Sequence, residues 1–176
     1  MQRLRKKTGT RNPEPGTRNL ELGTLNLEPG TRNLEPGTRN LEREAFSWPI
    51  RVYYEDTDSA GVVYYANYLK FIERARTEWL RAAGFEQHNI AAQYQAVFVV
   101  RAVAIEYLKP ALFNDSLQAT VEVAKVGNSQ IVLVQRVLRE GEALATAEVR
   151  VVCVNAATFR PVRIPKAIIA KIGTTS

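Results

Sequence analysis

The stretch NYLKFIERARTEWLRAAG, residues 67–84, decides the fold of this chain. Apolar side chains recur in it at spacings of three and four, which places them along one face of an α-helix. These side chains are Tyr68, Phe71, Ile72, Ala75, Trp79 and Ala82. Asn67 is a predicted N-cap and Gly84 a predicted C-terminal stop. The pattern therefore predicts a helix of about 17 residues that packs by a single face.

Residues on both sides of this helix follow patterns typical of β-strands. One strand is expected at 47–55, and four more are expected at 97–108, 116–126, 130–139 and 143–154. Short helices are expected at 86–95 and 166–172. The last four strands are joined by short turns, which make antiparallel neighbours. We therefore expect an α+β fold with the long helix across one face of a five-stranded antiparallel sheet, and a second subunit over the other face.

The first part of the chain has a different composition. Residues 9–43 are five seven-residue repeats, GTRNPEP, GTRNLEL, GTLNLEP, GTRNLEP and GTRNLER. A coiled coil needs two apolar positions per heptad, whereas these units offer about one and begin with Gly. Such a segment buries too little surface to offset its ordering entropy. We expect residues 1–45 to be a disordered tail and 46–176 to be the folded domain; an adhesive or interaction tail is the alternative.

Charge and cysteine content exclude several classes of function. The formal net charge is +6, but residues 1–44 hold nine Lys/Arg against six Asp/Glu, and the remainder holds fifteen against twelve. This even spread argues against a nucleic-acid site and favours a small phosphate-bearing molecule. No apolar run reaches the length of a transmembrane segment, and the basic start lacks the apolar core of a signal peptide. The single cysteine, Cys153, fits a reducing, cytoplasmic setting.

Two carboxylates stand just before the long helix. Asp56 and Asp58 are followed by Gly61 and then by the predicted helix start. The first amides of a helix have no intrahelical acceptor and can stabilise an oxyanion on a carbonyl. A carboxylate beside them can attack that carbonyl or deprotonate a water. The spacing is thus compatible with acyl transfer, although an Asp before a helix also serves as a plain cap.

The motif DxDxxGxVxYxNY at residues 56–68 resembles the signature of the 4-hydroxybenzoyl-CoA thioesterase family of hotdog proteins. The similarity is greatest to its bacterial branch encoded beside the Tol–Pal envelope genes, and it covers about residues 47–170. Further matching segments are ERARTE at 73–78, Tyr107 with KPA at 109–111, Asp115, and RPVRIP at 160–165. The resemblance implies a hotdog fold, with the helix wrapped by the sheet, and hydrolysis of acyl-CoA thioesters without a metal or cofactor.

The resemblance also implies roles for single residues. Asp58, rather than Asp56, falls on the catalytic aspartate, which acts as a nucleophile or as a general base. The backbone N–H of Tyr65 falls on the group that polarises the thioester carbonyl. The Tol–Pal branch commonly has His at position 65, so this tyrosine leaves the substrate preference open.

Other positions complete the expected substrate site. Gly61, Val62 and Tyr68 are expected to lie beside the substrate, and Gly61 would allow the loop to approach it closely. Arg160 and Arg163 are candidates for binding the CoA phosphates, since guanidinium matches phosphate geometry. Scattered surface arginines are the equally weighted alternative.

The remaining reactive residues point to no other enzyme class. His88, the only histidine, is far from the motif in sequence, which argues against a hydratase that uses a His–carboxylate pair. Cys153 is interpreted as a small core residue. The expected substrate is a short-chain or aromatic acyl-CoA, with an acyl carrier protein as a second candidate partner. A homodimer or homotetramer is expected, and a non-catalytic binding or envelope-associated module is the alternative function.

Overall fold

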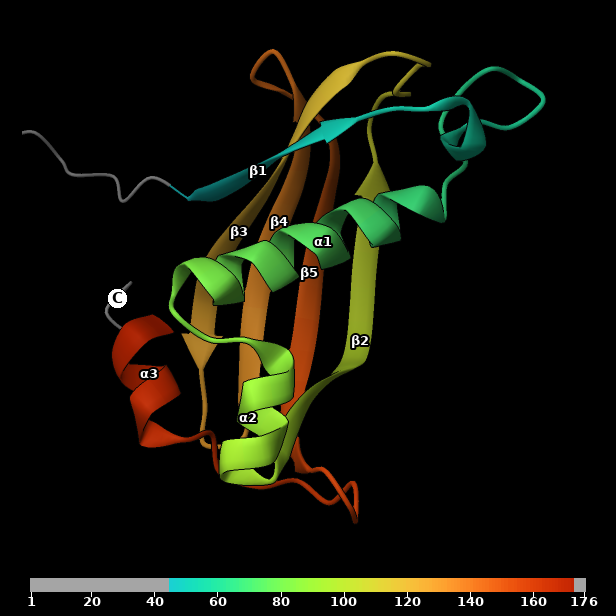
Figure 1. Cartoon of the computed structure of the whole chain (residues 1–176). Helices are drawn as coiled ribbons and strands as arrows, with labels where there is room; N and C mark the ends of the chain where they lie inside the picture. The colour runs from blue at the N-terminus through green and yellow to red at the C-terminus, as the bar shows by residue number, and fades with distance from the viewer. Residues whose placement is uncertain (1–44, 173–176) are drawn as a thin grey trace, which may run out of the picture. The chain divides into compact units, whose positions relative to one another are not determined.

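The computed structural model describes residues 45–172. The repeats at 9–43, and with them the prediction of a disordered tail, lie outside the described residues. The elements are, in chain order, β1 (Phe46–Arg51), the 3-10 helix η1 (Tyr54–Asp56), α1 (Asn67–Ala82), α2 (Gln87–Tyr94), β2 (Ala96–Tyr107), β3 (Ser116–Val126), β4 (Gln130–Arg139), β5 (Glu142–Asn155) and α3 (Lys166–Ile172). Helix α1 crosses one face of the sheet (Figure 1).

The five strands form one antiparallel sheet in the order β1-β3-β4-β5-β2. This confirms the predicted fold class, the strand number and the position of the long helix. The strand between α2 and β3 in sequence, β2, lies at an edge of the sheet and pairs only with β5 among the described strands. Strand β2 runs along the sheet from Ala96 to Tyr107, and the candidate site lies at the Tyr107 end.

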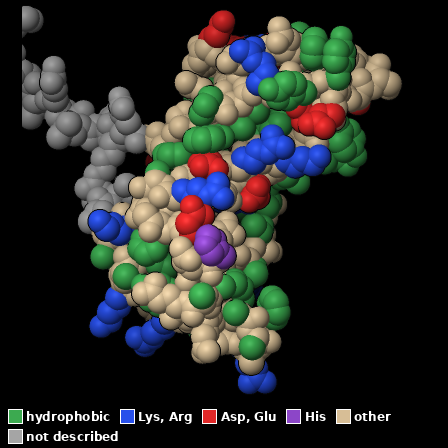
Figure 2. Space-filling view, in the orientation of Figure 1, with side chains coloured by type: hydrophobic (Ala, Val, Ile, Leu, Met, Phe, Trp, Pro, Cys, Tyr) green, Lys and Arg blue, Asp and Glu red, His purple; other side chains and the backbone are tan. Residues whose placement is uncertain are grey.

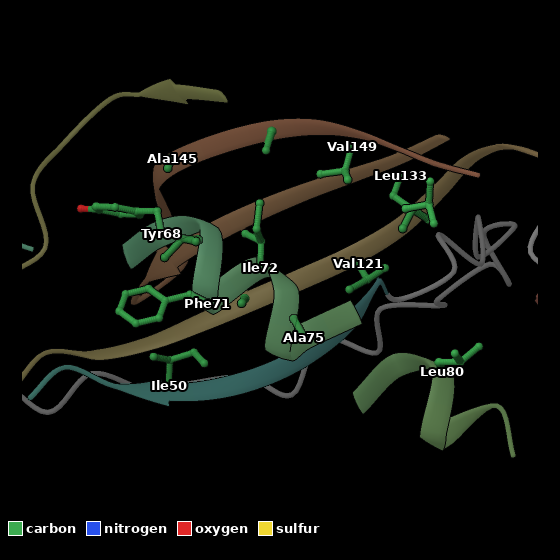
Figure 3. Close-up of a cluster of buried hydrophobic side chains, with 14 of the residues drawn as sticks. Ile50, Tyr68, Phe71, Ile72, Ala75, Leu80, Val121, Leu133, Ala145 and Val149 are labelled. Atoms are coloured by element: carbon green, nitrogen blue, oxygen red, sulfur yellow. The ribbon is translucent and has the colours of Figure 1, made fainter. Parts of the chain in front are cut away.

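The core lies between α1 and the sheet, where side chains from the helix meet those of β1, β3, β4 and β5 (Figure 3). The helix contributes Tyr68, Phe71, Ile72, Ala75 and Leu80 as buried apolar residues. The prediction was wrong at the last turn, because Ala82 is exposed and Leu80 is buried instead. The reason is α3, which places Ile168 and Ile172 beside Leu80 around one cavity.

The start of α1 also differs from the prediction. Ala66 is the N-cap and makes no capping bond through its side chain, whereas Asn67 is the first helical residue. The buried Asn67 side chain donates a hydrogen bond from Nδ2 to the Asp56 carbonyl oxygen at 2.9 Å. Tertiary contact with η1 thus replaces the expected cap. The predicted stop at Gly84 is confirmed, because this residue has φ +91°, which favours glycine.

One buried polar residue joins α1 to the sheet. Gln135 on β4 is fully buried, and its Oε1 accepts a hydrogen bond from Nη1 of Arg76 at 2.8 Å. Its Nε2 donates to the carbonyl oxygens of Ile72 at 2.9 Å and Thr120 at 3.3 Å. Burial lowers the pKa of Arg76, an effect that the charge of Glu73 partly offsets. The Arg76 guanidinium and the Ile72 carbonyl therefore both have a hydrogen-bond partner in the Gln135 side chain.

Candidate active site

Asp56 builds the turn that precedes the long helix. Its side chain is buried, and Oδ2 accepts a hydrogen bond from the Tyr53 N–H at 2.9 Å. Its carbonyl oxygen accepts from the Tyr64 N–H at 2.8 Å as well as from Asn67. Both ends of the loop between η1 and α1 are thus tied to this residue. A carboxylate used in this way is structural, which leaves the second aspartate of the motif available for chemistry.

Asp58 lies on the tip of the loop, and its side chain is exposed. Its N–H donates to the Val62 carbonyl oxygen at 2.9 Å, and its own carbonyl oxygen accepts from the Gly61 N–H at 3.0 Å. Oδ1 accepts from the Ala60 N–H at 2.8 Å, whereas Oδ2 accepts no hydrogen bond from residues 45–172. One carboxylate oxygen therefore fixes the side chain and the other is free to react.

Gly61 has a backbone conformation that favours glycine. Its φ is +76°, in the left-handed region, and a Cβ built there would meet no atom within 4 Å. Backbone conformation rather than crowding therefore accounts for the residue. The expected close approach of this loop to a substrate stays a prediction.

The loop that follows β2, at residues 108–115, contacts the loop that carries Asp58. The Val63 N–H donates to the Ala111 carbonyl oxygen at 2.8 Å, and Val62 forms a bridge with Leu112. The buried Ala111 N–H donates to the Tyr68 hydroxyl oxygen at 2.9 Å, which links this second loop to α1. Tyr68 thus supports the loop structurally, and its role beside the substrate stays a prediction.

We expect Tyr68→Phe to lower the free energy of unfolding by about 1–3 kcal/mol, because the Ala111 N–H would be left buried without an acceptor. Burial is the main cause that raises the pKa of Tyr68, so its hydroxyl stays neutral at ordinary pH. Urea unfolding followed by circular dichroism would measure the change. Tyr94→Phe is the matched control, and equal stability of the two variants would contradict the assignment.

Two backbone amides just before α1 have no hydrogen-bond acceptor among residues 45–172. Neither the Tyr65 N–H nor the Ala66 N–H donates to an acceptor within the described part of the chain. Beside them is a hollow of about 270 Å³, lined by Val63, Tyr65, Tyr68, Tyr107, Leu108, Lys109 and Pro110. Unpaired amides at a helix start, next to a hollow with aromatic walls, can receive the oxygen of a polarised carbonyl.

Apolar side chains surround this end of the domain. Those with large exposed areas are Tyr53, Tyr54, Tyr64, Tyr65, Tyr107, Leu108, Leu112 and Phe113. Figure 2 shows hydrophobic side chains gathered at the upper right of the view, near the start of α1, while Lys/Arg and Asp/Glu side chains lie along the helix surface. The site region is therefore apolar at its rim, which suits an acyl group better than a sugar or a free phosphate.

Not all predicted site residues meet in one chain. Tyr65 and Tyr68 line the hollow, whereas Asp58, Gly61 and Val62 stand on the adjoining loop and do not line it. A more enclosed apolar cavity of about 230 Å³ lies along the second half of α1 and contains none of these residues. The hollow is the candidate site, because it lies beside the unpaired Tyr65 and Ala66 amides, at the end of the loop that carries the exposed Asp58.

Arg160 and Arg163 lie at the opposite end of the sheet. Both are exposed, and their segment pairs with the end of β5, where the Asn155 N–H donates to the Arg160 carbonyl oxygen at 2.9 Å. Asn155 is opposite Ala96, the first residue of β2, while the hollow is beside Tyr107, the last. At about 3.3 Å per residue, β2 separates the two ends by about 35 Å. The two arginines are thus remote from the Asp58 of the same chain.

The structure adds Tyr107 to the candidate site and places His88 and Cys153 outside it. Tyr107 reaches the helix start, a role that its position at the end of a strand pattern does not signal. His88 is exposed on α2, and Cys153 is buried and free, with a pKa raised by burial.

No group of three His, Cys, Asp or Glu residues within 45–172 could hold a metal ion. No helix in the same range is long and apolar enough to cross a membrane.

Comparison with known proteins identifies the family of the chain. A family model described as the thioesterase-like superfamily matches residues 52–172. The acyl-CoA thioesterase YbgC of Haemophilus influenzae is 46% identical over 121 residues, which cover 69% of this chain and 89% of that protein. The acyl-CoA thioester hydrolase YbgC of Escherichia coli O6:H1 is 45% identical over 72% of this chain and 94% of its own length. The crystal structure of a probable thioesterase from Bartonella henselae is similar with a TM-score of 0.67 and 33% identity, covering 69% of this chain and 100% of that one.

Proposed function

Because the chain belongs to the thioesterase-like superfamily and is a thioester hydrolase, we propose that it hydrolyses acyl-CoA thioesters with Asp58 as the catalytic carboxylate. The observation that supports this most is the free Oδ2 of Asp58, on the loop that leads to the unpaired Tyr65 N–H. The carbonyl oxygen of the thioester would accept a hydrogen bond from this N–H. Negative charge that develops on the oxygen would then be stabilised at the helix start.

Two routes are compatible with an exposed carboxylate. In the first, an Asp58 oxygen attacks the thioester carbon, the C–S bond breaks, CoA leaves as the thiolate, and water hydrolyses the resulting mixed anhydride. In the second, Asp58 takes a proton from water, the water oxygen attacks the same carbon, and the C–S bond breaks so that CoA leaves as the thiolate. In both, the thiolate takes up a proton or remains ionised, and a carboxylic acid is released. Incorporation of ¹⁸O from water into Asp58 during a single turnover would indicate the first route.

The separation of Asp58 from Arg163 favours a site shared by two copies of the chain. Strand β2 is an edge strand on which Val100 and Val103 remain 49% and 39% exposed. Antiparallel pairing of β2 with a second β2 would extend the sheet and place the Ala96 end of one copy beside the Tyr107 end of the other. Arg160 and Arg163 of one copy would then reach the CoA bound at the other. We propose a dimer of this kind, alone or within a tetramer.

We expect Arg163→Ala to weaken CoA binding about fivefold at low salt, because an exposed ion pair with phosphate contributes about 1 kcal/mol. The difference from the wild-type protein should shrink as salt screens the charges. Inhibition by free CoA, measured at two ionic strengths, tests this. Arg74→Ala, which removes an exposed arginine on α1, is the control. Unchanged inhibition at low salt would assign Arg163 to the general surface.

The proposal also covers the range of acyl substrates and the cellular location of the enzyme. The aromatic hollow supports short-chain or aromatic acyl groups, and an acyl carrier protein is a second candidate donor of the acyl group. The buried, unpaired Cys153 supports a cytoplasmic setting, and the motif at 56–68 supports the Tol–Pal-associated branch of the family. A panel of acyl-CoAs of graded length, with free thiol detected colorimetrically, tests the proposal. Absence of thiol release with every member would overturn it.

A further inference from the structure

We infer that Tyr107 is a positioning residue for the oxyanion donor: its hydroxyl holds the Tyr65 carbonyl, which orients the Ala66 N–H and restrains Tyr65, the residue whose N–H is the proposed donor. This inference rests on the proposed role of the Tyr65 N–H. It concerns a side chain at the end of an edge strand, 42 residues away in sequence.

The contact is direct. The Tyr107 hydroxyl donates a hydrogen bond to the Tyr65 carbonyl oxygen at 3.0 Å. The two rings also meet edge to face, with centroids 6.3 Å apart, and Tyr107 makes a second edge-to-face contact with Tyr68 at 5.4 Å. All three rings line the hollow beside the helix start. Tyr107 thus binds the peptide that follows Tyr65, next to the peptide that carries the proposed donor N–H, and it contacts the aromatic wall of the hollow.

Backbone geometry explains why this bond matters. A peptide group is planar, so fixing its carbonyl also fixes the N–H of the next residue. The Tyr64 carbonyl accepts from the Asn67 N–H at 2.8 Å, which fixes the plane that contains the Tyr65 N–H. The Tyr65 carbonyl, held by Tyr107, belongs to the plane that contains the Ala66 N–H. Tyr65 is therefore held on both sides of its Cα, although its own side chain is 60% exposed.

The backbone around Tyr107 is held in place by hydrogen bonds to β5. Tyr107 pairs with Ala145 in the sheet, and the N–H groups of Leu108 and Lys109 both donate to the Leu144 carbonyl oxygen, at 2.8 and 3.1 Å. The tyrosine therefore projects from a segment that β5 holds in place. Burial, together with the neighbouring Tyr65, raises the pKa of Tyr107, which keeps the hydroxyl protonated and able to donate at neutral pH.

The test compares Tyr107→Phe with wild type and with Tyr94→Phe, in the full chain and with one good acyl-CoA substrate. Removal of one neutral hydrogen bond should lower kcat about five- to tenfold. The KM should stay within about twofold, because the ring and the hollow remain. The melting temperature serves as the check on folding. An unchanged kcat, or a rise in KM that accounts for the whole loss, would overturn the inference.

A spectroscopic measurement separates this inference from the proposed function. The substrate, labelled with ¹³C at the thioester carbonyl, is bound to Asp58→Asn, and its carbonyl stretch is recorded by isotope-edited infrared spectroscopy. A shift to lower frequency relative to free substrate supports the amide donors. Adding Tyr107→Phe should move the stretch back toward the free value. No shift in Asp58→Asn alone overturns both proposals, whereas a shift that Tyr107→Phe leaves unchanged overturns only the role of Tyr107.

Discussion

Asp58→Asn is expected to lower the turnover of acyl-CoA by a factor on the order of 10²–10⁴, the range for loss of a general base. Loss of a nucleophile would fall at the upper end of this range or beyond. The amide keeps the shape of the side chain and an oxygen for the Ala60 N–H, so the loop should keep its conformation. Because the Asp58 side chain is exposed, the free energy of unfolding should change by less than about 0.5 kcal/mol.

Glu55→Gln provides the matched control for this experiment. Glu55 is an exposed carboxylate in η1, three residues earlier, and removing its charge alters the same local field. Thiol release should stay close to wild type in this variant. Equal losses in Glu55→Gln and Asp58→Asn would mean that net charge, rather than a positioned carboxylate, sets the rate. Near-normal turnover in Asp58→Asn would exclude this aspartate as the catalytic group.

Gln135→Leu should produce the largest loss of stability among single substitutions proposed for this protein. Leucine of similar size fills the space, but the Arg76 guanidinium loses its acceptor at 2.8 Å, and the Ile72 carbonyl loses a donor. Removing one partner of a buried charged group typically costs about 3–5 kcal/mol. Because Arg76 is only partly buried, we expect a loss of about 3 kcal/mol, measured by urea unfolding.

The double variant Gln135→Leu/Arg76→Leu tests the reason for that loss. Replacing both partners by apolar groups of similar shape can be nearly neutral. The double variant should therefore be more stable than Gln135→Leu alone. A further loss of stability in the double variant would show that the unpaired Arg76 guanidinium is not the cause of the loss in Gln135→Leu.

Secondary structure was predictable from the sequence because it depends on local patterns. Periods of two and of 3.6 residues, with Gly84 and the short turns, suffice to place the last four strands and the three α-helices of the described chain within a residue or two. The first strand was predicted too long, because it ends at Arg51 and residues 54–56 form η1 instead. The errors fall where distant segments meet. Asn67 caps nothing because Asp56 lies beside it, and Leu80 is buried because α3 reaches the same turn of α1.

The sequence by itself determined the fold class and the family motif, because alternation, helical spacing and the DxD loop each lie within a few residues along the chain. The choice of Asp58 as the catalytic carboxylate is what the resemblance implies, and it stays a prediction. Only the tertiary structure separated the environments of the two aspartates, since Asp56 is buried by the folded loop and Asp58 is exposed. It also brought Tyr107 to the Tyr65 carbonyl, and it placed Arg163 toward the Ala96 end of β2, whereas the hollow lies at the Tyr107 end. Contacts across such sequence distances arise from the order of strands in the sheet, which no local pattern encodes.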